Sequence, residues 1–107
     1  MAKITHIVKR TGAVVPFNQD RITNAIYRAA VAVGGRDRST AEELSNLVVQ
    51  MLEQRTPEGH TPSVEEIQDV VEKVLIENGH ARTAKAFILY RDERARSRQH
   101  AARPPRR

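Results

Sequence analysis

Three basic residues near the start of the chain have the types and spacing needed to hold an anion. They lie in the segment 8-VKRTGAVVPFNQDRI-22, where Lys9 and Arg10 precede a glycine turn and Arg21 follows Asn18 by three residues. Asn18 is a natural N-cap, so the free N–H groups of a helix N-terminus would lie near the cations that leave the strand. The segment therefore predicts an anion cradle formed by Lys9, Arg10 and Arg21.

The apolar residues between these cations, 14-VVPF-17, extend the hypothesis to a nucleotide. They would form a wall for a purine base while the cations hold its phosphates. However, paired basic residues at a hairpin turn, and an arginine in the first turn of a helix, are usually solvated surface. The phosphate-loop patterns GxxxxGK[ST] and GxGxxG are absent. The residues alone leave both interpretations open.

A β-hairpin is expected to carry the first part of this cradle. Residues 4–9 are rich in β-branched side chains, residues 10–13 contain the glycine of a turn, and residues 14–17 form a second short β segment. Pro16 cannot donate to a β-ladder and is expected to end the second strand.

Four amphipathic helices are expected to follow. The first begins at Gln19, directly after the Asn18 cap, and stops at the glycine pair 34–35. Its predicted buried face consists of Ile22, Ala25, Ile26, Ala29, Ala30 and Val33.

The second helix is expected to start at a cap formed by Ser39 or Thr40, with Glu42 or Glu43 completing a capping box, and to end near Gln54. Its predicted buried stripe is Leu44, Leu47, Val48, Met51 and Leu52.

The last two helices follow a proline-containing loop at residues 56–63. A capping box of Ser63 and Glu66 opens the third helix, and Asn78 with Gly79 ends it. Its predicted stripe is Val64, Ile67, Val70, Val71, Val74 and Leu75, and the fourth helix is expected over residues 80–94 with Ala84, Phe87, Ile88 and Arg91 on one side.

The predicted fold class is mostly α, with a small β-hairpin cap on a four-helix bundle, because each helix has one apolar face to bury. The length of 107 residues fits one domain, expected over residues 1–96. Residues 97–107 are expected to be a disordered Arg/Pro-rich tail. No apolar run is long enough for a membrane helix and no secretory signal is evident, so a cytoplasmic location is expected.

The net charge of +5 is unevenly distributed. Residues 1–93 contain twelve Lys and Arg against thirteen Asp and Glu, a net charge of −1, whereas residues 94–107 contain six Arg and no acid. Nucleic-acid binding is therefore expected only weakly, through the tail. The preferred interpretation of the tail is a disordered solubilising end, and the start of a linker is the other alternative.

Three ordered motifs resemble the ATP-cone domain, a family of regulatory modules. The segment 8-VKRTGAVVPFNQDRI-22 resembles the family's opening V-x-K-R-[DN]-G signature, 63-SVEEIQDVVEKVL-75 resembles its third helix, and 84-AKAFILYRDER-94 resembles its terminal A-[KR]-A-[FY]-I-x-Y-R pattern. The resemblance covers residues 3–96 and implies a four-helix bundle under a small β cap.

The resemblance also implies roles for particular residues. Lys9, Arg10 and Arg21 match positions that contact phosphates in the family, and Val15, Phe17, Asn18 and Ile22 match positions around the base and sugar. Gln68, Lys85 and Arg91 match positions that face the pocket. Two positions depart from the pattern: Thr11 replaces the usual acidic residue of the turn, and Val15 stands where some members carry a glutamate that reads the base.

The function implied by the resemblance is allosteric regulation by ATP or dATP, with or without Mg²⁺, acting on a ribonucleotide reductase subunit through nucleotide-dependent association, including homo-oligomers. The chain contains no cysteine, so it lacks the thiols of a reductase active site, and no enzymatic activity is expected. Two alternatives stay open: a nucleotide-responsive transcriptional regulator of reductase genes, and a helical interaction module without a ligand.

Metal binding and acid–base catalysis are not expected. The four histidines, His6, His60, His80 and His100, do not have HxxxH or HExxH spacing. The acidic residues near the start of the third helix, Glu65, Glu66, Asp69 and Glu72, are of the kind that stabilises a helix N-terminus.

Overall fold

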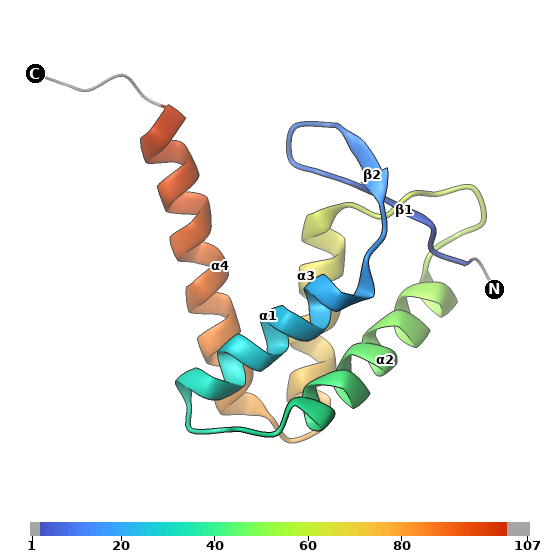
Figure 1. The fold of residues 1–107 in the computed structure, drawn as a ribbon. Helices are drawn as coiled ribbons and strands as arrows, with labels where there is room; N and C mark the ends of the chain where they lie inside the picture. Colours follow the sequence, from blue (N-terminus) through green and yellow to red (C-terminus); the bar gives the residue numbers. More distant parts are fainter. Residues whose placement is uncertain (1–2, 103–107) are drawn as a thin grey trace, which may run out of the picture.

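The structure is a computed structural model that describes the backbone of residues 3–102 and the side chains of residues 3–92. Two strands, β1 (His6–Val8) and β2 (Val14–Pro16), precede four helices: α1 (Gln19–Ala32), α2 (Arg38–Arg55), α3 (Val64–Glu77) and α4 (Ala81–Ala102). Figure 1 shows the hairpin standing at one end of the helices. The predicted fold class is thus confirmed.

The hairpin forms around a turn that requires glycine. His6 pairs with Pro16 and Val8 with Val14 in an antiparallel register, and Pro16 is the last residue of β2 as predicted. Gly12 has a φ of 90°, a left-handed conformation that side chains with a Cβ rarely adopt. The turn therefore places Lys9, Arg10 and Thr11 at the tip of the hairpin.

The hairpin is attached to the start of α3. The Val8 N–H donates to the Pro62 carbonyl at 2.9 Å, and Val8 forms a parallel bridge with Ser63. The tip of the hairpin is therefore held close to the first turn of α3, although more than fifty residues separate them in the sequence.

The four helices pack in a cyclic order around one aliphatic core. α1 lies against α2 and α4, and α3 lies against the same two helices (Figure 1). The core contains Ile26, Val48, Val74, Leu75 and Phe87, each at most 4% exposed. Ile22, Ile26 and Ala29 of the predicted α1 face are buried, and its other members are partly buried. The predicted face of α3 is buried except for the partly buried Val64. Leu47 of the predicted α2 stripe is 38% exposed. Ala41 and Ser45 complete the buried face of α2.

The caps of α1 and α3 are as predicted, whereas the cap of α2 is not. Asn18 accepts a hydrogen bond from the Asp20 N–H, and Ser63 and Glu66 form a complete capping box. α2 begins one residue before Ser39, and its N-cap is Asp37.

Asp37 caps the helix in preference to Ser39 and Thr40 because its carboxylate accepts hydrogen bonds from the Ser39 N–H, the Ser39 hydroxyl and the Thr40 hydroxyl. Ser39 and Thr40 are thus partners of the cap rather than the cap itself. The capping box predicted with Glu42 or Glu43 was consequently wrong.

The carboxylates of two capping residues are stabilised in their charged form. Hydrogen bonds from the Ser39 side chain and backbone hold the pKa of Asp37 below its ordinary value. The pKa of Glu66 is also lowered, mainly because its carboxylate accepts from the Ser63 N–H, with a smaller contribution from His60.

α4 continues to Ala102, beyond the end predicted near residue 94. The last five residues of the predicted tail, 103–107, lie outside the described residues. The division into a domain over residues 1–96 and a tail over residues 97–107 stays a prediction. Within the described residues, no helix combines the length and apolar character needed to cross a membrane.

Candidate functional site

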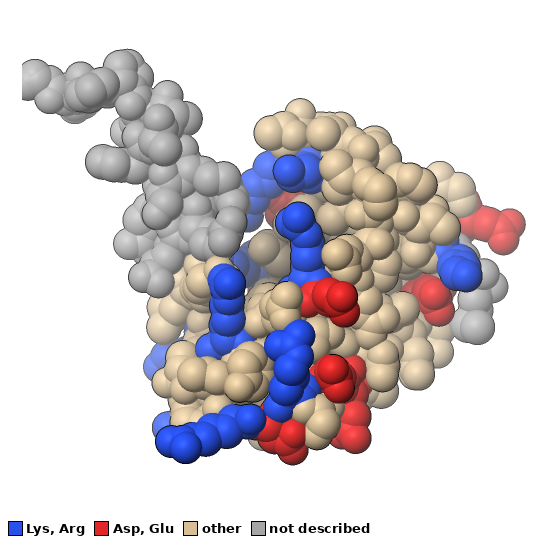
Figure 2. Space-filling view, in the orientation of Figure 1, with Lys and Arg blue, Asp and Glu red and all other residues tan. Residues whose placement is uncertain are grey.

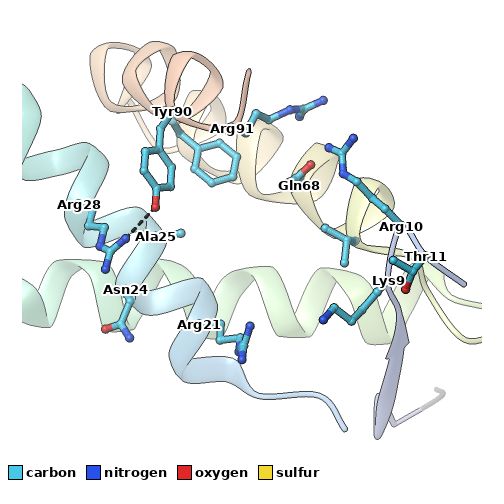
Figure 3. Close-up of a pocket in the computed structure, with 12 residues that line it drawn as sticks. Lys9, Arg10, Thr11, Arg21, Asn24, Ala25, Arg28, Gln68, Tyr90 and Arg91 are labelled. Atoms are coloured by element: carbon cyan, nitrogen blue, oxygen red, sulfur yellow. Dashed lines mark hydrogen bonds between the residues drawn. The ribbon is translucent and has the colours of Figure 1, made fainter. Parts of the chain in front are cut away.

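A cavity of about 630 Å³ opens between the hairpin tip and helices α1, α3 and α4. Figure 3 shows its lining residues converging from these four elements. The hairpin contributes Lys9, Arg10 and Thr11, α1 contributes Arg21, Asn24, Ala25 and Arg28, α3 contributes Val64 and Gln68, and α4 contributes Phe87, Tyr90 and Arg91.

Five residues of the predicted site meet at this pocket. Lys9 and Arg10 reach it from the hairpin, Arg21 from α1, Gln68 from α3 and Arg91 from α4. These five residues come from four elements, and the fold brings them together although up to about eighty residues separate them in the sequence. Figure 2 shows basic side chains gathered around the recess between the hairpin and α4.

The other five predicted site residues do not line the pocket. Val15 pairs with Ile7 in the hairpin, Phe17 packs against the core, Asn18 caps α1, Ile22 is buried in the core and Lys85 is exposed. The apolar wall predicted from residues 14–17 is therefore not part of this cavity, and Val14 is 60% exposed. Contact between these residues and a base stays a prediction.

The pocket includes residues that the sequence interpretation missed. Arg28 and Asn24 follow Arg21 by seven and three residues, which places all three on one face of α1. Phe87 and Tyr90 precede Arg91 on α4 and provide the aromatic part of the lining. Helical spacing from Arg21 would have identified Arg28 and Asn24, but the proximity of α1 to α4 at this point depends on tertiary packing.

Arg28 and Tyr90 contact each other across the pocket. The Arg28 Nη1 atom donates to the Tyr90 hydroxyl at 2.7 Å, as the dashed line in Figure 3 marks. The guanidinium also lies 5.9 Å from the centre of the Tyr90 ring, within the range of a cation–π contact. This contact joins α1 to α4 along one edge of the cavity.

The cations of the pocket fall into two groups. Arg10 lies 3.4 Å from the Glu65 carboxylate, and Arg91 contacts the carboxylates of Glu72 and Asp69. Within residues 3–92, Lys9 and Arg21 have no carboxylate within ion-pair distance. Among the described side chains, the positive charges of Lys9 and Arg21 are therefore not neutralised by a nearby acid, whereas those of Arg10 and Arg91 are.

Gln68 provides an independent indication that the pocket receives a polar ligand. Its Oε1 atom is buried and has no hydrogen-bond partner among the side chains and backbone that the structure describes. A buried acceptor without a partner costs free energy, and a donor group of a bound ligand would remove that cost. Because Gln68 lines the pocket beside Arg10 and Arg91 (Figure 3), a ligand with both anionic and hydroxyl or amino groups fits the lining.

The pocket lining contains no Asp or Glu among the described residues. In the same part of the chain there is also no group of three or more His, Cys, Asp or Glu that could hold a metal ion. The lining thus combines cations, amides, hydroxyls and apolar groups.

Fold and pocket together define a small helical domain with a basic site beneath a β-hairpin. The model of the ATP cone domain matches residues 5–96 of this sequence. This match covers most of the chain, so the protein belongs to the ATP-cone family. The ATP cone is the allosteric nucleotide-binding module of ribonucleotide reductases, and its members bind ATP or dATP as effectors.

Relatives of the chain are ribonucleotide reductases. The vitamin B12-dependent ribonucleoside-diphosphate reductase of Thermoplasma acidophilum is 45% identical over 101 residues, covering 90% of this chain and 13% of the relative. The ribonucleoside-diphosphate reductase subunit alpha of Chlamydia pneumoniae is 36% identical, with 86% and 10% covered. The anaerobic ribonucleoside-triphosphate reductase of Salmonella typhimurium is 34% identical, with 92% and 13% covered. The chain therefore spans only about a tenth to an eighth of these relatives.

Proposed function

We propose that this chain binds ATP or dATP in the pocket between the hairpin and α1, α3 and α4, and that it acts as a regulatory module without hydrolysing the nucleotide. The observation that carries the proposal is the convergence of Lys9, Arg10, Arg21 and Arg91 on one cavity. Membership of the ATP-cone family supports an adenine nucleotide as the ligand.

The charge distribution supports binding of the phosphates near the hairpin tip. Lys9 and Arg21 have no neighbouring acid within the described side chains, so an incoming phosphate would not need to displace one there. Lysine provides a compact charge, and the planar guanidinium of arginine can donate two parallel hydrogen bonds to a phosphate. These two residues are therefore the proposed primary phosphate contacts.

The composition of the lining supports binding without hydrolysis. Activation of an attacking water requires a base, and the residues described as lining the cavity include no carboxylate for this role. A magnesium ion accompanying the nucleotide would be held by the phosphates themselves, because carboxylate ligands of the usual kind are missing from the described lining.

The partner proposed for the module is a ribonucleotide reductase subunit, because the relatives that carry a similar segment are reductases. The nucleotide would act by changing association with that partner or with further copies of the chain. Residues 1–93 carry a net charge of −1, which disfavours a role as a sequence-specific DNA-binding regulator.

Calorimetry with ATP, dATP and GTP tests this function. The wild type is expected to bind ATP or dATP in preference to GTP. The variant Lys9→Ala/Arg21→Ala should bind at least about a hundredfold more weakly, because each charge-assisted hydrogen bond contributes roughly 1.5–3 kcal/mol.

The matched control is Arg55→Ala/Lys73→Ala, which removes the same two charges from positions outside the pocket lining and should leave the affinity almost unchanged. Absence of heat with every nucleotide, equal affinity for ATP and GTP, or equal weakening by both double variants would contradict the proposal.

A further inference from the structure

Three carboxylates form a row along α3 beside the pocket. Glu65, Asp69 and Glu72 are spaced by four and three residues, so they lie on one face of the helix. Gln68, which belongs to the same stretch, lines the cavity. The row does not line the cavity itself, but each of its members contacts an arginine that does.

The contact between Arg91 and Glu72 is the most shielded of these ion pairs. The Arg91 Nη1 atom donates to a Glu72 carboxylate oxygen, and the two side chains are only 24% and 23% exposed. Asp69 lies 3.6 Å from the same Nη1 atom and is 72% exposed. Because solvent screens Glu72 least, its charge acts most strongly on Arg91.

The contact between Arg10 and Glu65 is weaker. The Arg10 Nε atom lies 3.4 Å from a Glu65 carboxylate oxygen, and the side chains are 38% and 46% exposed. Arg10 is thus held at the hairpin tip by an acid in the first turn of α3. Two of the four predicted cations at the pocket are therefore already paired with a carboxylate in the protein itself.

We propose that the α3 carboxylate row, with Glu72 as its dominant member, competes with the phosphates of the nucleotide for Arg91 and Arg10 and thereby sets the affinity of the pocket. This inference rests on the proposed function. A carboxylate and a phosphate accept the same hydrogen bonds from a guanidinium. A phosphate that engages Arg91 therefore gains only the difference between its own interaction and the one with Glu72.

The row also repels phosphates directly, and this effect grows with ligand charge. A triphosphate carries more negative charge than a diphosphate or a monophosphate, so the same carboxylate disfavours ATP most and AMP least. Lys9 and Arg21, which have no acid partner within the described side chains, would provide the attraction that all three ligands share. The repulsion by the row offsets part of this attraction and so raises the dissociation constant for ATP. A sensor responds only when its dissociation constant is close to the concentration of its ligand.

The decisive experiment is calorimetry of the full chain with ATP, ADP and AMP, comparing the wild type with Glu72→Gln. Glutamine keeps the shape of the side chain and removes its charge. The affinity for ATP should increase by roughly threefold to tenfold, as expected for a half-shielded ion pair, with a smaller increase for ADP and the smallest for AMP.

The matched control is Glu77→Gln. It makes the same substitution on the same helix, but Glu77 pairs with Lys73 rather than with a cation of the pocket. Its affinities should stay within about twofold of the wild type, because a distant exposed charge is largely screened. An equal gain in ATP affinity in both variants would show that the effect comes from the net charge of the protein, and it would overturn the proposal.

Arg91→Ala tests whether the competition runs through Arg91. In the Arg91→Ala background, the gain from Glu72→Gln should be smaller than in the wild-type background, because competition for the guanidinium is gone and only the direct repulsion of the phosphates remains. Unchanged or weaker ATP binding by Glu72→Gln in the wild-type background would instead show that Glu72 holds Arg91 in its binding orientation, and the competition would be refuted.

A second variant keeps the proposal testable if Glu72→Gln does not fold. Glu65→Gln/Asp69→Asn leaves the Arg91–Glu72 contact in place and should still tighten ATP binding by about twofold or more, relative to a Glu43→Gln/Glu77→Gln control. Unchanged or weaker binding would overturn the inference. Failure of the wild type to bind any adenine nucleotide would refute the proposed function, whereas binding without these changes would refute only the role of the row.

Discussion

A hydrogen-bonded group of polar residues is buried between α1 and α2. Ser45 is completely buried and Thr23 is 4% exposed. The Thr23 hydroxyl donates to the Ser45 hydroxyl at 2.8 Å, the Ser45 hydroxyl donates to the Glu42 carbonyl at 2.9 Å, and the Gln19 amide donates to the Ser45 oxygen at 3.1 Å. Apolar periodicity could not identify these residues, since their burial depends on finding partners across the helix interface.

Replacement of Ser45 by alanine should lower the free energy of unfolding by about 1–3 kcal/mol, because the Thr23 hydroxyl and the Gln19 amide lose a buried partner. Urea unfolding measures this change. The double variant Thr23→Val/Ser45→Ala, which removes both hydroxyls, should be less destabilised than the sum of its single variants. Strict additivity would argue against a coupled pair.

At the scale of one helix, the start of α3 holds its capping carboxylate in the charged form. The Glu66 carboxylate accepts from the Ser63 N–H at 2.7 Å and lies 3.1 Å from His60 Nε2. Hydrogen bonding lowers the pKa of Glu66 in the folded state relative to its ordinary value of 4.5. Its contribution to stability is thus fully present above pH 4.5 and is lost as the pH falls through the folded-state pKa.

Glu66→Gln should therefore reduce the acid sensitivity of the domain. The difference in unfolding free energy between wild type and variant should shrink as the pH falls from about 6 to about 3, and it should not exceed about 1 kcal/mol because the group is half exposed. Urea midpoints over this pH range provide the measurement. Glu43→Gln, on the exposed surface of α2, serves as the control, and an identical pH slope in all three proteins would disprove the assignment.

At the same scale, the start of α2 illustrates how local hydrogen bonds choose between candidate caps. Ser39 or Thr40 was the expected cap, although Asp37 is an equally good capping residue. Asp37 prevails because it accepts from both of the others. A charged acceptor near the helix N-terminus is also favoured by the helix dipole.

At the scale of the whole molecule, the proposed nucleotide would contact the hairpin and three helices at once. A ligand that bridges elements stabilises the arrangement in which all of its contacts are formed. The outer surface includes the apolar side chains of Val31, Ile76 and Leu89, which are 49%, 56% and 57% exposed. These residues belong to α1, α3 and α4, so a change in the relative positions of the three helices would alter the apolar surface available for association.

Light scattering should consequently show a different average mass with and without dATP, at nucleotide concentrations well above the dissociation constant. The Lys9→Ala/Arg21→Ala variant should keep the ligand-free mass at the same dATP concentration, because it lacks the proposed phosphate contacts. If the wild type binds dATP with no change in mass, nucleotide-dependent self-association is wrong, and association with a reductase subunit is the form of regulation to test.

The sequence by itself determined the secondary-structure elements and offered a candidate anion site. Apolar periodicity placed the helices, and the glycine turn and Pro16 placed the hairpin, since both signals act over a few neighbouring residues. The residue types and spacing of Lys9, Arg10 and Arg21 allowed an anion site but did not distinguish it from solvated surface. The hairpin, the helices and the candidate cations Lys9, Arg10 and Arg21 could therefore be identified from local patterns.

Only the tertiary structure decided how the pocket is lined and which of its cations are already paired. Residues 14–17, which local order placed next to the cations, do not line the cavity, whereas Arg28, Phe87 and Tyr90 reach it because α1 packs against α4. Pairing of Arg10 with Glu65 and of Arg91 with Glu72 likewise arises across long sequence separations. Such contacts depend on the packing of whole helices, which no short stretch of the sequence specifies.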